Sequence, residues 1–238
     1  MAAKLVIAST PPDKGKITNQ LREALENCDV ILHDRLIDVG ILEGVKAKKV
    51  FVGKQPYKKH PSQDSINDMI RMYLKRGLRV VRLKGGDAAF FSRATEEVAV
   101  AEELNVEVQW IAGVTAASLL CERLKTSLTV RGVSNGVIFI TGHTRDNKIE
   151  EEYDWDAIVR LKMTLVIYMG IKNLPLISKL LMDRGMDPFT PVAVGMNLGF
   201  DDEKVEFFYL KDLKEKREDL KPPAIVVIGD VLRYSLDK

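Results

Sequence analysis

Short apolar runs alternate with amphipathic segments along much of the chain, and this alternation constrains the fold more than any other feature. Runs at residues 5–8, 30–32 and 80–83 are rich in Val, Ile and Leu, which is typical of strands buried in a sheet. Between them, residues 17–28 place apolar side chains at helical spacing. Strands that alternate with helices predict a mostly parallel sheet with helices on both of its faces.

The alternation becomes less regular from about residue 127 onward. A length of 238 residues allows two medium-sized domains. We therefore expect a boundary near residue 125, with one α/β domain at residues 1–125 and a second at residues 126–238. Further apolar runs predict strands in the second domain, at residues 137–140, 165–168, 192–194, 205–210 and 224–228.

Glycine follows most of these apolar runs. Some of these glycines are expected to form tight turns, but so many at one sheet edge favour a cleft where backbone meets a flat or bulky ligand. No Gly-x-Gly-x-x-Gly follows the first run, so the usual NAD signature is absent. The glycines are Gly85, Gly142, Gly170, Gly195 and Gly229, together with Gly53 and Gly113, which follow two further apolar runs at residues 49–52 and 106–111.

The run at residues 80–83 leads directly into Lys84 and then Gly85-Gly86-Asp87. Two glycines let a ligand approach the main chain closely, and Asp87 stands at the carboxyl end of a strand, where open α/β sheets bind ligands. An ordinary turn, or an acid that caps a helix, explains the same residues without a ligand.

Composition narrows the classes of function. Hydrophobic residues make up 46% and charged residues 29% of the chain, as in globular proteins. A net charge of +2 argues against binding nucleic acid by bulk charge.

Cys28 and Cys121 lie far apart and predict buried thiols in a reducing compartment. The three histidines have no metal-ligand spacing, so no metal is expected. No signal peptide or membrane span is expected either, which favours a cytoplasmic protein.

Six segments in this order and spacing resemble the tetrapyrrole methylases, and within them the S-adenosylmethionine-dependent uroporphyrinogen-III C-methyltransferases. The resemblance runs over nearly the whole chain. Its segments are residues 29–36, 52–54, 61–67, 79–87, 128–132 and 141–143.

The resemblance implies two α/β domains, the first with a mostly parallel sheet and the second with a mixed sheet, in a homodimer. It places S-adenosylmethionine, with S-adenosylhomocysteine as its product, in a cleft between the domains. The positions that match the family's cofactor contacts are Pro11, Gly85, Gly86, Asp87, Phe90, Thr115, Ala116, Met169 and Leu198.

Asp34 and Lys54 match the residues that the family uses as proton acceptor and proton donor. A pyrrole carbon must lose a proton after methylation, and a carboxylate in a cleft is a suitable receiver. An acid at this position could equally form a salt bridge with Arg35. Lys54 could instead bind a carboxylate of the substrate.

The implied substrate, uroporphyrinogen III, carries many carboxylates, and arginine suits carboxylates best. Candidates for binding it are Arg35, Arg82, Arg131 and His143.

The implied reaction is C-methylation of uroporphyrinogen III to precorrin-2 through precorrin-1, for sirohaem or cobalamin. The alternatives are another methylase of this fold, acting on a later corrin precursor, on ribosomal RNA ribose or on a protein, and an inert protein that only binds the cofactor. Residues 9–13 and 88–95 depart from the family's pattern and motivate the inert alternative.

Overall fold

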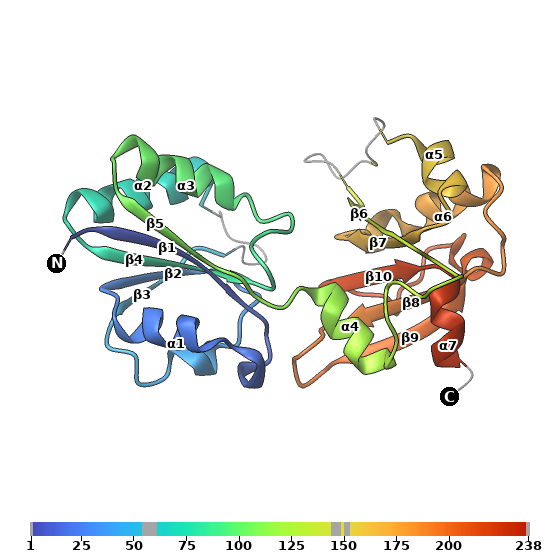
Figure 1. The fold of residues 1–238 in the computed structure, drawn as a ribbon, viewed down its shortest axis with the longest axis horizontal. Coiled ribbons are helices and arrows are strands. Elements are labelled where there is room, and N and C mark those ends of the chain that lie inside the picture. Colours follow the sequence, from blue (N-terminus) through green and yellow to red (C-terminus); the bar gives the residue numbers. More distant parts are fainter. Residues whose placement is uncertain (1, 54–60, 144–148, 150–152, 237–238) are drawn as a thin grey trace. The chain divides into compact units, whose positions relative to one another are not determined.

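The computed structural model describes residues 2–53, 61–143, 149 and 153–236. The chain forms two compact units, Met1–Thr115 and Ala116–Lys238, each with its own sheet (Figure 1). The division falls ten residues before the expected one at residue 125. Helix α4 (Ala116–Leu124) belongs to the second unit, because its Leu120 packs against Gly195 of that unit. A Cβ added to Gly195 would lie only 3.0 Å from Cδ1 of Leu120.

The sheet of the first unit is parallel throughout, with strand order β3-β2-β4-β1-β5. In the described part of this unit, three α-helices and two short 3-10 helices connect the strands. The strands are β1 (Lys4–Thr10), β2 (Val30–His33), β3 (Lys48–Phe51), β4 (Arg79–Gly85) and β5 (Glu107–Ile111). The helices are α1 (Asn19–Glu26), α2 (Gln63–Lys75), α3 (Ala94–Glu103), η1 (Lys14–Lys16) and η2 (Val39–Leu42).

Successive residues of a strand face opposite sides of a sheet, and this splits the core of the first unit in two. Leu5 and Ile7 of β1 pack with α2 and α3, whereas Val6 and Ala8 pack with α1. Figure 1 shows α1 on one side of the sheet and α2 with α3 on the other. Each fully buried aliphatic side chain stabilises the fold by roughly 1.5 to 3 kcal/mol.

Local signals define the ends of α2. The hydroxyl of Ser62 accepts a hydrogen bond from the Ser65 N–H at 3.1 Å, which satisfies an amide that the helix cannot. At the other end Gly77 takes a φ of 78° and its N–H donates to the carbonyl of Leu74. Ser62 and Gly77 therefore mark the two ends of α2 through contacts within a few residues of each end.

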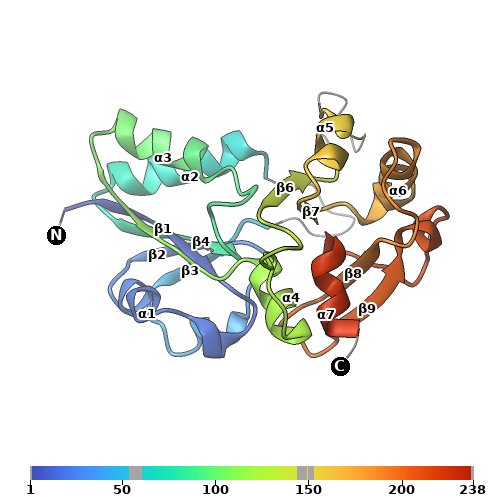
Figure 2. The ribbon, with the colours of Figure 1, turned by 45° about the vertical axis from the view of Figure 1, so that its right-hand side comes forward.

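The sheet of the second unit is mixed, with strand order β6-β7-β10-β8-β9. Helices α5 and α6 pack on one face, and α4 and α7 lie on the other (Figure 2). The strands are β6 (Val137–Thr141), β7 (Thr164–Tyr168), β8 (Pro191–Met196), β9 (Lys204–Tyr209) and β10 (Ala224–Ile228). The helices after α4 are α5 (Trp155–Arg160), η3 (Ile171–Asn173), α6 (Leu174–Asp183), η4 (Leu210–Leu213), η5 (Asp230–Leu232) and α7 (Arg233–Leu236).

Strand direction corrects the expectation that all the glycines share one edge. Strands β6, β7 and β8 run in one direction, while β10 runs antiparallel to both β7 and β8. Gly229, which follows β10, therefore lies at the edge opposite to Gly142 and Gly170. Gly195 lies inside β8 and ends no strand. The predicted α/β class, with a parallel first sheet and a mixed second sheet, is confirmed.

Candidate functional site

The carboxyl edge of the first sheet holds several of the predicted site residues. Because its strands are all parallel, their carboxyl ends meet at one edge, where α/β sheets bind ligands. Pro11 follows β1, Asp34 follows β2, Gly86 and Asp87 follow β4, and Thr115 lies beyond β5. Lys54 follows β3 in the sequence but lies outside the described residues.

Hydrogen bonds join the loop after β4 to the end of β1. The N–H of Gly86 donates to the carbonyl of Thr10 at 2.7 Å, and the N–H of Ala88 donates to the hydroxyl of Ser9 at 2.9 Å. Ser9 is 1% exposed, so this hydroxyl has little access to water. Ser9 is not among the site residues predicted from the sequence. A serine inside an otherwise apolar strand was the available signal, because a buried hydroxyl needs a partner.

The glycines at this edge are required by the close approach of neighbouring backbone. A Cβ on Gly85 would lie 2.2 Å from the carbonyl oxygen of Leu36. A Cβ on Gly113 would lie 2.5 Å from the carbonyl oxygen of Gly86. Gly86 itself takes a φ of 80°, which favours glycine. The ends of β4 and β5 therefore meet as bare backbone.

Asp87 forms the turn that the sequence allowed as an alternative to ligand binding. Its Oδ1 accepts the N–H of Ala89 at 2.9 Å, and its carbonyl accepts the N–H of Phe90 at 3.1 Å. The turn does not use Oδ2 of Asp87. A partly exposed carboxylate beside bare glycine backbone suits a ligand that offers hydroxyl or ammonium groups and can lie against the main chain. The residues present at this edge therefore fit a cofactor of the S-adenosylmethionine kind.

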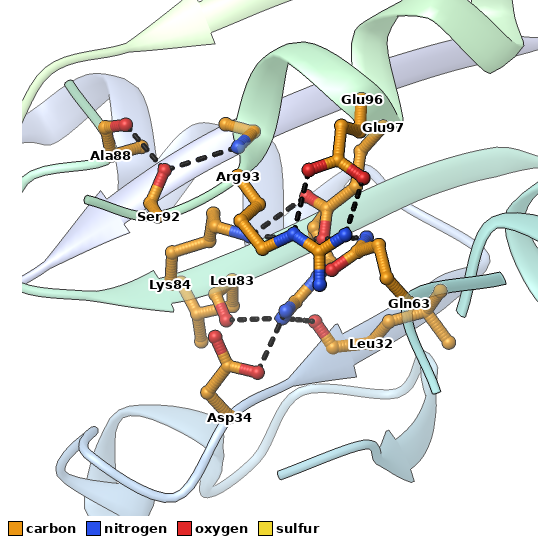
Figure 3. A network of polar contacts seen from close by, with 12 residues as sticks. Leu32, Asp34, Gln63, Leu83, Lys84, Ala88, Ser92, Arg93, Glu96 and Glu97 are labelled. Carbon is orange, nitrogen blue, oxygen red and sulfur yellow. Dashed lines mark hydrogen bonds and ion pairs between the residues drawn. The ribbon is translucent and has the colours of Figure 1, made fainter. Parts of the chain in front are cut away.

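Asp34 is held by a buried network on β4 and α3 (Figure 3). The Nη2 of Arg82 lies 2.7 Å from Oδ1 of Asp34, and its Nε lies 3.0 Å from Oε1 of Glu97. Lys84 Nζ lies 2.9 Å from both carboxylate oxygens of Glu97. The side chain of Asp34 is 30% exposed, whereas that of Glu97 is inaccessible. Asp34 is thus the member of the network that reaches solvent.

The strand period explains why these groups meet. Arg82 and Lys84 are two residues apart on β4, so they point to the same face of the sheet, the face that α2 and α3 cover. Glu97 reaches them from α3 and accepts a further bond from Gln63 of α2 at 3.2 Å. Two buried cations need an acid partner. Glu97 is that partner, and it was not among the residues predicted from the sequence.

Burial and neighbouring charge act on these groups together. Burial lowers the pKa of Lys84, and repulsion from Arg82 lowers it further, against the attraction of Glu97. Burial also disfavours the charged form of Arg82, but Asp34 and Glu97 outweigh it and raise the pKa of that guanidinium. Arg82 therefore stays positive between its two acids.

The structure assigns different surroundings to the basic residues predicted to bind substrate. Arg82 is 2% exposed, and its third nitrogen, Nη1, donates to the carbonyls of Leu32 and Leu83. All three of its nitrogens have protein partners, which favours holding Asp34 over reaching a substrate. Arg35 is exposed, and the ion pair of Asp34 is made with Arg82 in place of this neighbour. Arg131 lies exposed in a turn after α4.

Three predicted residues of the second unit share one edge of its sheet. His143, Met169 and Leu198 follow β6, β7 and β8, which run in the same direction. His143 Nδ1 lies 2.8 Å from the carbonyl oxygen of Met169. A carbonyl only accepts, so Nδ1 carries a proton and Nε2 is the ring atom left for another partner. Ala116 opens α4 in this unit.

Met169 and Leu198 differ in what they present. Met169 takes a φ of 53° and is 46% exposed, which leaves its side chain accessible at the end of β7. Leu198 is 7% exposed and packs on Gly195, where an added Cβ would lie 2.9 Å from its Cδ1. A non-glycine residue with positive φ is uncommon, and such backbone concentrates at functional sites.

The remaining features of the described residues do not point to a different kind of functional site. A hollow of about 580 Å³ lies between α1 and residues 40–46. No group of His, Cys, Asp and Glu among the described residues is arranged to hold a metal. No helix in the described part of the chain is long and apolar enough to span a membrane.

Comparison with known proteins identifies the family. The model of the tetrapyrrole (corrin/porphyrin) methylases matches residues 4–214. The siroheme synthase of Pseudoalteromonas atlantica is 34% identical over 231 residues, which are 95% of this chain and 50% of that protein. The chain therefore belongs to the tetrapyrrole methylase family, a family of methyltransferases, and this confirms the resemblance seen in the sequence.

Solved structures agree with this assignment. The uroporphyrin-III C-methyl transferase of Thermus thermophilus, complexed with S-adenyl homocysteine, is 29% identical with a TM-score of 0.82. The match covers 98% of this chain and 100% of that one. A cobalt precorrin-4 methyltransferase, at 20% identity and a TM-score of 0.83, shares the fold. The chain spans about half the length of the curated relatives it matches.

Proposed function

We propose that this chain transfers methyl groups from S-adenosylmethionine to carbon atoms of uroporphyrinogen III, giving precorrin-2 through precorrin-1. One observation carries the proposal within this family. The glycine loop at Gly85–Asp87 and the carboxylate of Asp34 follow neighbouring parallel strands, β4 and β2, at one edge of the first sheet. The likeness to a uroporphyrin-III C-methyl transferase structure complexed with S-adenyl homocysteine supports both the cofactor and the substrate class.

The residues of the first unit would hold the cofactor mainly through backbone. Gly85 and Gly86 leave the main chain bare, and Asp87 offers Oδ2 to hydroxyl or ammonium groups. Pro11 and Phe90 would border the same loop, and Thr115 follows β5 beside it. The bound cofactor supplies an electrophilic methyl group on a sulfonium. Transfer from it depends on alignment, so positioning supplies most of the gain in rate.

We propose that Ala116, Met169 and Leu198 supply the second unit's contacts to the cofactor. Met169 would do so with its exposed side chain, and buried Leu198 with the backbone of its turn. Arg35, Arg131 and His143 are our candidates for the carboxylates of the substrate. The guanidinium groups of Arg35 and Arg131 are exposed, and His143 keeps Nε2 for a further partner.

Asp34 would accept the proton that the methylated pyrrole carbon must lose. The C–H bond breaks, its electron pair stays with the ring, and the proton moves to the carboxylate. Arg82 occupies Oδ1 of Asp34, so Oδ2 is the oxygen that we assign to the proton. Lys54 keeps its proposed role as proton donor.

Mass spectrometry of uroporphyrinogen III incubated with the protein and methyl-labelled S-adenosylmethionine tests the proposal. We expect product masses raised by one and then two labelled methyl groups. Calorimetry with S-adenosylhomocysteine accompanies this assay. Binding without methylation of uroporphyrinogen III would contradict the proposed reaction and favour a later corrin precursor or an inert binder. No binding would remove the cofactor site.

The departure from the family's pattern at residues 9–13 does not by itself favour an inert protein that only binds the cofactor. Ser9 and Thr10 are the last two residues of β1, and both hydrogen-bond to the loop after β4, through the Ser9 hydroxyl and the Thr10 carbonyl. We therefore propose that these residues support the cofactor loop. We also propose that the product serves sirohaem or cobalamin formation and that the protein is a homodimer, which light scattering of the purified chain checks.

A further inference from the structure

We infer that Glu97 is a positioning residue for the reaction, acting through Arg82 to orient Asp34 and to set the proton affinity of its carboxylate. The catalytic meaning of this inference rests on the proposed function, in which Asp34 accepts a proton. The electrostatic coupling between Glu97 and Asp34 does not depend on that function and can be measured without turnover.

A continuous line of contacts connects the two acids. Glu97 Oε1 accepts from Arg82 Nε at 3.0 Å, and Arg82 Nη2 donates to Asp34 Oδ1 at 2.7 Å. The guanidinium between them is rigid and planar, so fixing one end of it fixes the other. Glu97 is itself fixed by Lys84 and Gln63. Asp34 is thereby held from inside the unit while its carboxylate remains partly exposed.

Charge counting shows what Glu97 does to Asp34. Arg82 and Lys84 bring two positive charges, and Glu97 brings one negative charge. The inner three residues therefore keep one net positive charge, which ionised Asp34 balances. When Asp34 takes up a proton, this buried positive charge is left without a partner, which is unfavourable in a low-dielectric interior. Glu97 thus reduces the net positive charge beside Asp34 from two to one.

Within the described residues, other ionisable groups near Asp34 are its sequence neighbours at the end of β2. His33 Nδ1 lies 3.2 Å from the backbone carbonyl of Asp34, and its ring meets Phe51 edge-on at 5.5 Å. Arg35 is exposed, so water screens its charge. Among the described residues, the buried charges that act on Asp34 are those of Arg82, Lys84 and Glu97.

Removing one charge at a time predicts shifts of opposite sign. Glu97→Gln removes a negative charge, which leaves more positive charge beside Asp34 and favours its ionised form. Lys84→Gln removes a positive charge and disfavours that form. We expect the midpoint of Asp34 titration to fall by about one pH unit in Glu97→Gln and to rise by a similar amount in Lys84→Gln.

The experiment is NMR titration of the full chain labelled with ¹³C at aspartate carboxyl carbons. Asp34→Asn assigns the signal of Asp34 by its loss. Glu96→Gln is the matched control, because Glu96 neighbours Glu97 on α3 but pairs with exposed Arg93. We expect no shift of the Asp34 midpoint in this control. If Glu97→Gln does not fold, Lys84→Gln decides the question from the opposite direction.

Shifts of opposite sign support the inference, and so does an upward shift in Lys84→Gln if Glu97→Gln does not fold. A folded Glu97→Gln whose Asp34 midpoint is unchanged overturns it. Unchanged midpoints, or shifts in the same direction, overturn it. In active protein the acidic limb of the pH–rate profile should move with the midpoints. A titration that shifts as expected in a protein that never methylates uroporphyrinogen III keeps the coupling and rejects only the proposed function.

Discussion

The N–H of Gly86 lies 2.7 Å from the carbonyl oxygen of Thr10, so the loop after β4 is hydrogen-bonded to the end of β1. These strands are neighbours in the sheet, and Thr10 is paired in register with Gly85. The bond extends the ladder by one residue beyond the last strand pair and then releases the chain into the turn at Asp87. The sheet therefore fixes the backbone position of Asp87, so that a substitution at Asp87 tests the side chain alone.

Replacing Asp87 by alanine should weaken binding of S-adenosylhomocysteine by about ten- to a hundredfold, the loss of one or two charge-assisted hydrogen bonds. Asp87→Asn is the matched variant, because its side-chain oxygen can still accept the N–H of Ala89 and keep the turn. Calorimetry on both variants separates the two roles. Weak binding in both supports a ligand contact, whereas full affinity in Asp87→Asn would assign Asp87 to the turn alone.

Gly85→Ala should destabilise the first unit and abolish cofactor binding, because its Cβ would lie 2.2 Å from the backbone oxygen of Leu36. We expect a loss of about 1 to 3 kcal/mol in the free energy of unfolding, the range for forced overpacking. Gly44→Ala is the control, since nothing lies within 4 Å of its added Cβ and only its φ of 74° opposes it. Urea unfolding measures both. Equal losses in the two variants would contradict the close approach.

Asp34→Asn should slow methylation of uroporphyrinogen III by about a hundredfold or more, since general bases contribute roughly 10²- to 10⁴-fold. The amide is nearly the same size, so the affinity for S-adenosylhomocysteine should stay within about twofold. Single-turnover rates and calorimetry on the same preparation check both statements. A variant with wild-type rates would reduce Asp34 to a structural partner of Arg82.

Glu97→Gln should cost about 3 to 5 kcal/mol of unfolding free energy, because it leaves Lys84 buried without its ion-pair partner and leaves Arg82 with Asp34 alone. Its neighbour Glu96 pairs with Arg93 at the surface, and Glu96→Gln should change stability by no more than about 0.5 kcal/mol. Chemical unfolding of both variants at neutral pH makes the comparison. Similar small losses would mean that water reaches the network.

The thiol of Cys28 should make stability fall in alkaline solution. Burial, helped by the charge of Asp29, raises the pKa of Cys28 to about 11 from an ordinary value of 9.0. Between these values the unfolded chain loses the proton and the folded chain keeps it, so unfolding becomes more favourable as the pH rises. The Tm of Cys28→Ala should therefore rise relative to that of the wild type as the pH increases from 9 to 11. A constant difference in Tm across this range would contradict the shift.

Much of the first unit could be predicted from the sequence because its strands are short, apolar and separated by clear helix signals. Ser62 and Gly77 mark the ends of α2 by chemistry that acts within a few residues. The glycines after β4 and β5 were visible for the same reason. Local signals are enough to predict this sheet, because strands that are connected by helices run parallel to one another.

Relations between distant residues could not be predicted in the same way. The sequence at β10 is apolar whichever way the strand runs, so the position of Gly229 at the opposite edge was not visible. Glu96 and Glu97 stand together at the start of α3, and only the packing of that helix shows that the second is buried against Arg82. The role of Ser9 likewise depends on Ala88, which lies far along the chain.

The buried network also limits how this sequence can drift over generations. Exchanging one of Arg82, Lys84 and Glu97 for a neutral residue leaves the others with an uncompensated charge inside the fold. Viable lineages must therefore change these positions together, by replacing an acid and a base in concert or by exchanging the whole set for apolar side chains. In an alignment of descendants, the three positions should vary as a correlated group while the exposed pair of Arg93 and Glu96 varies independently.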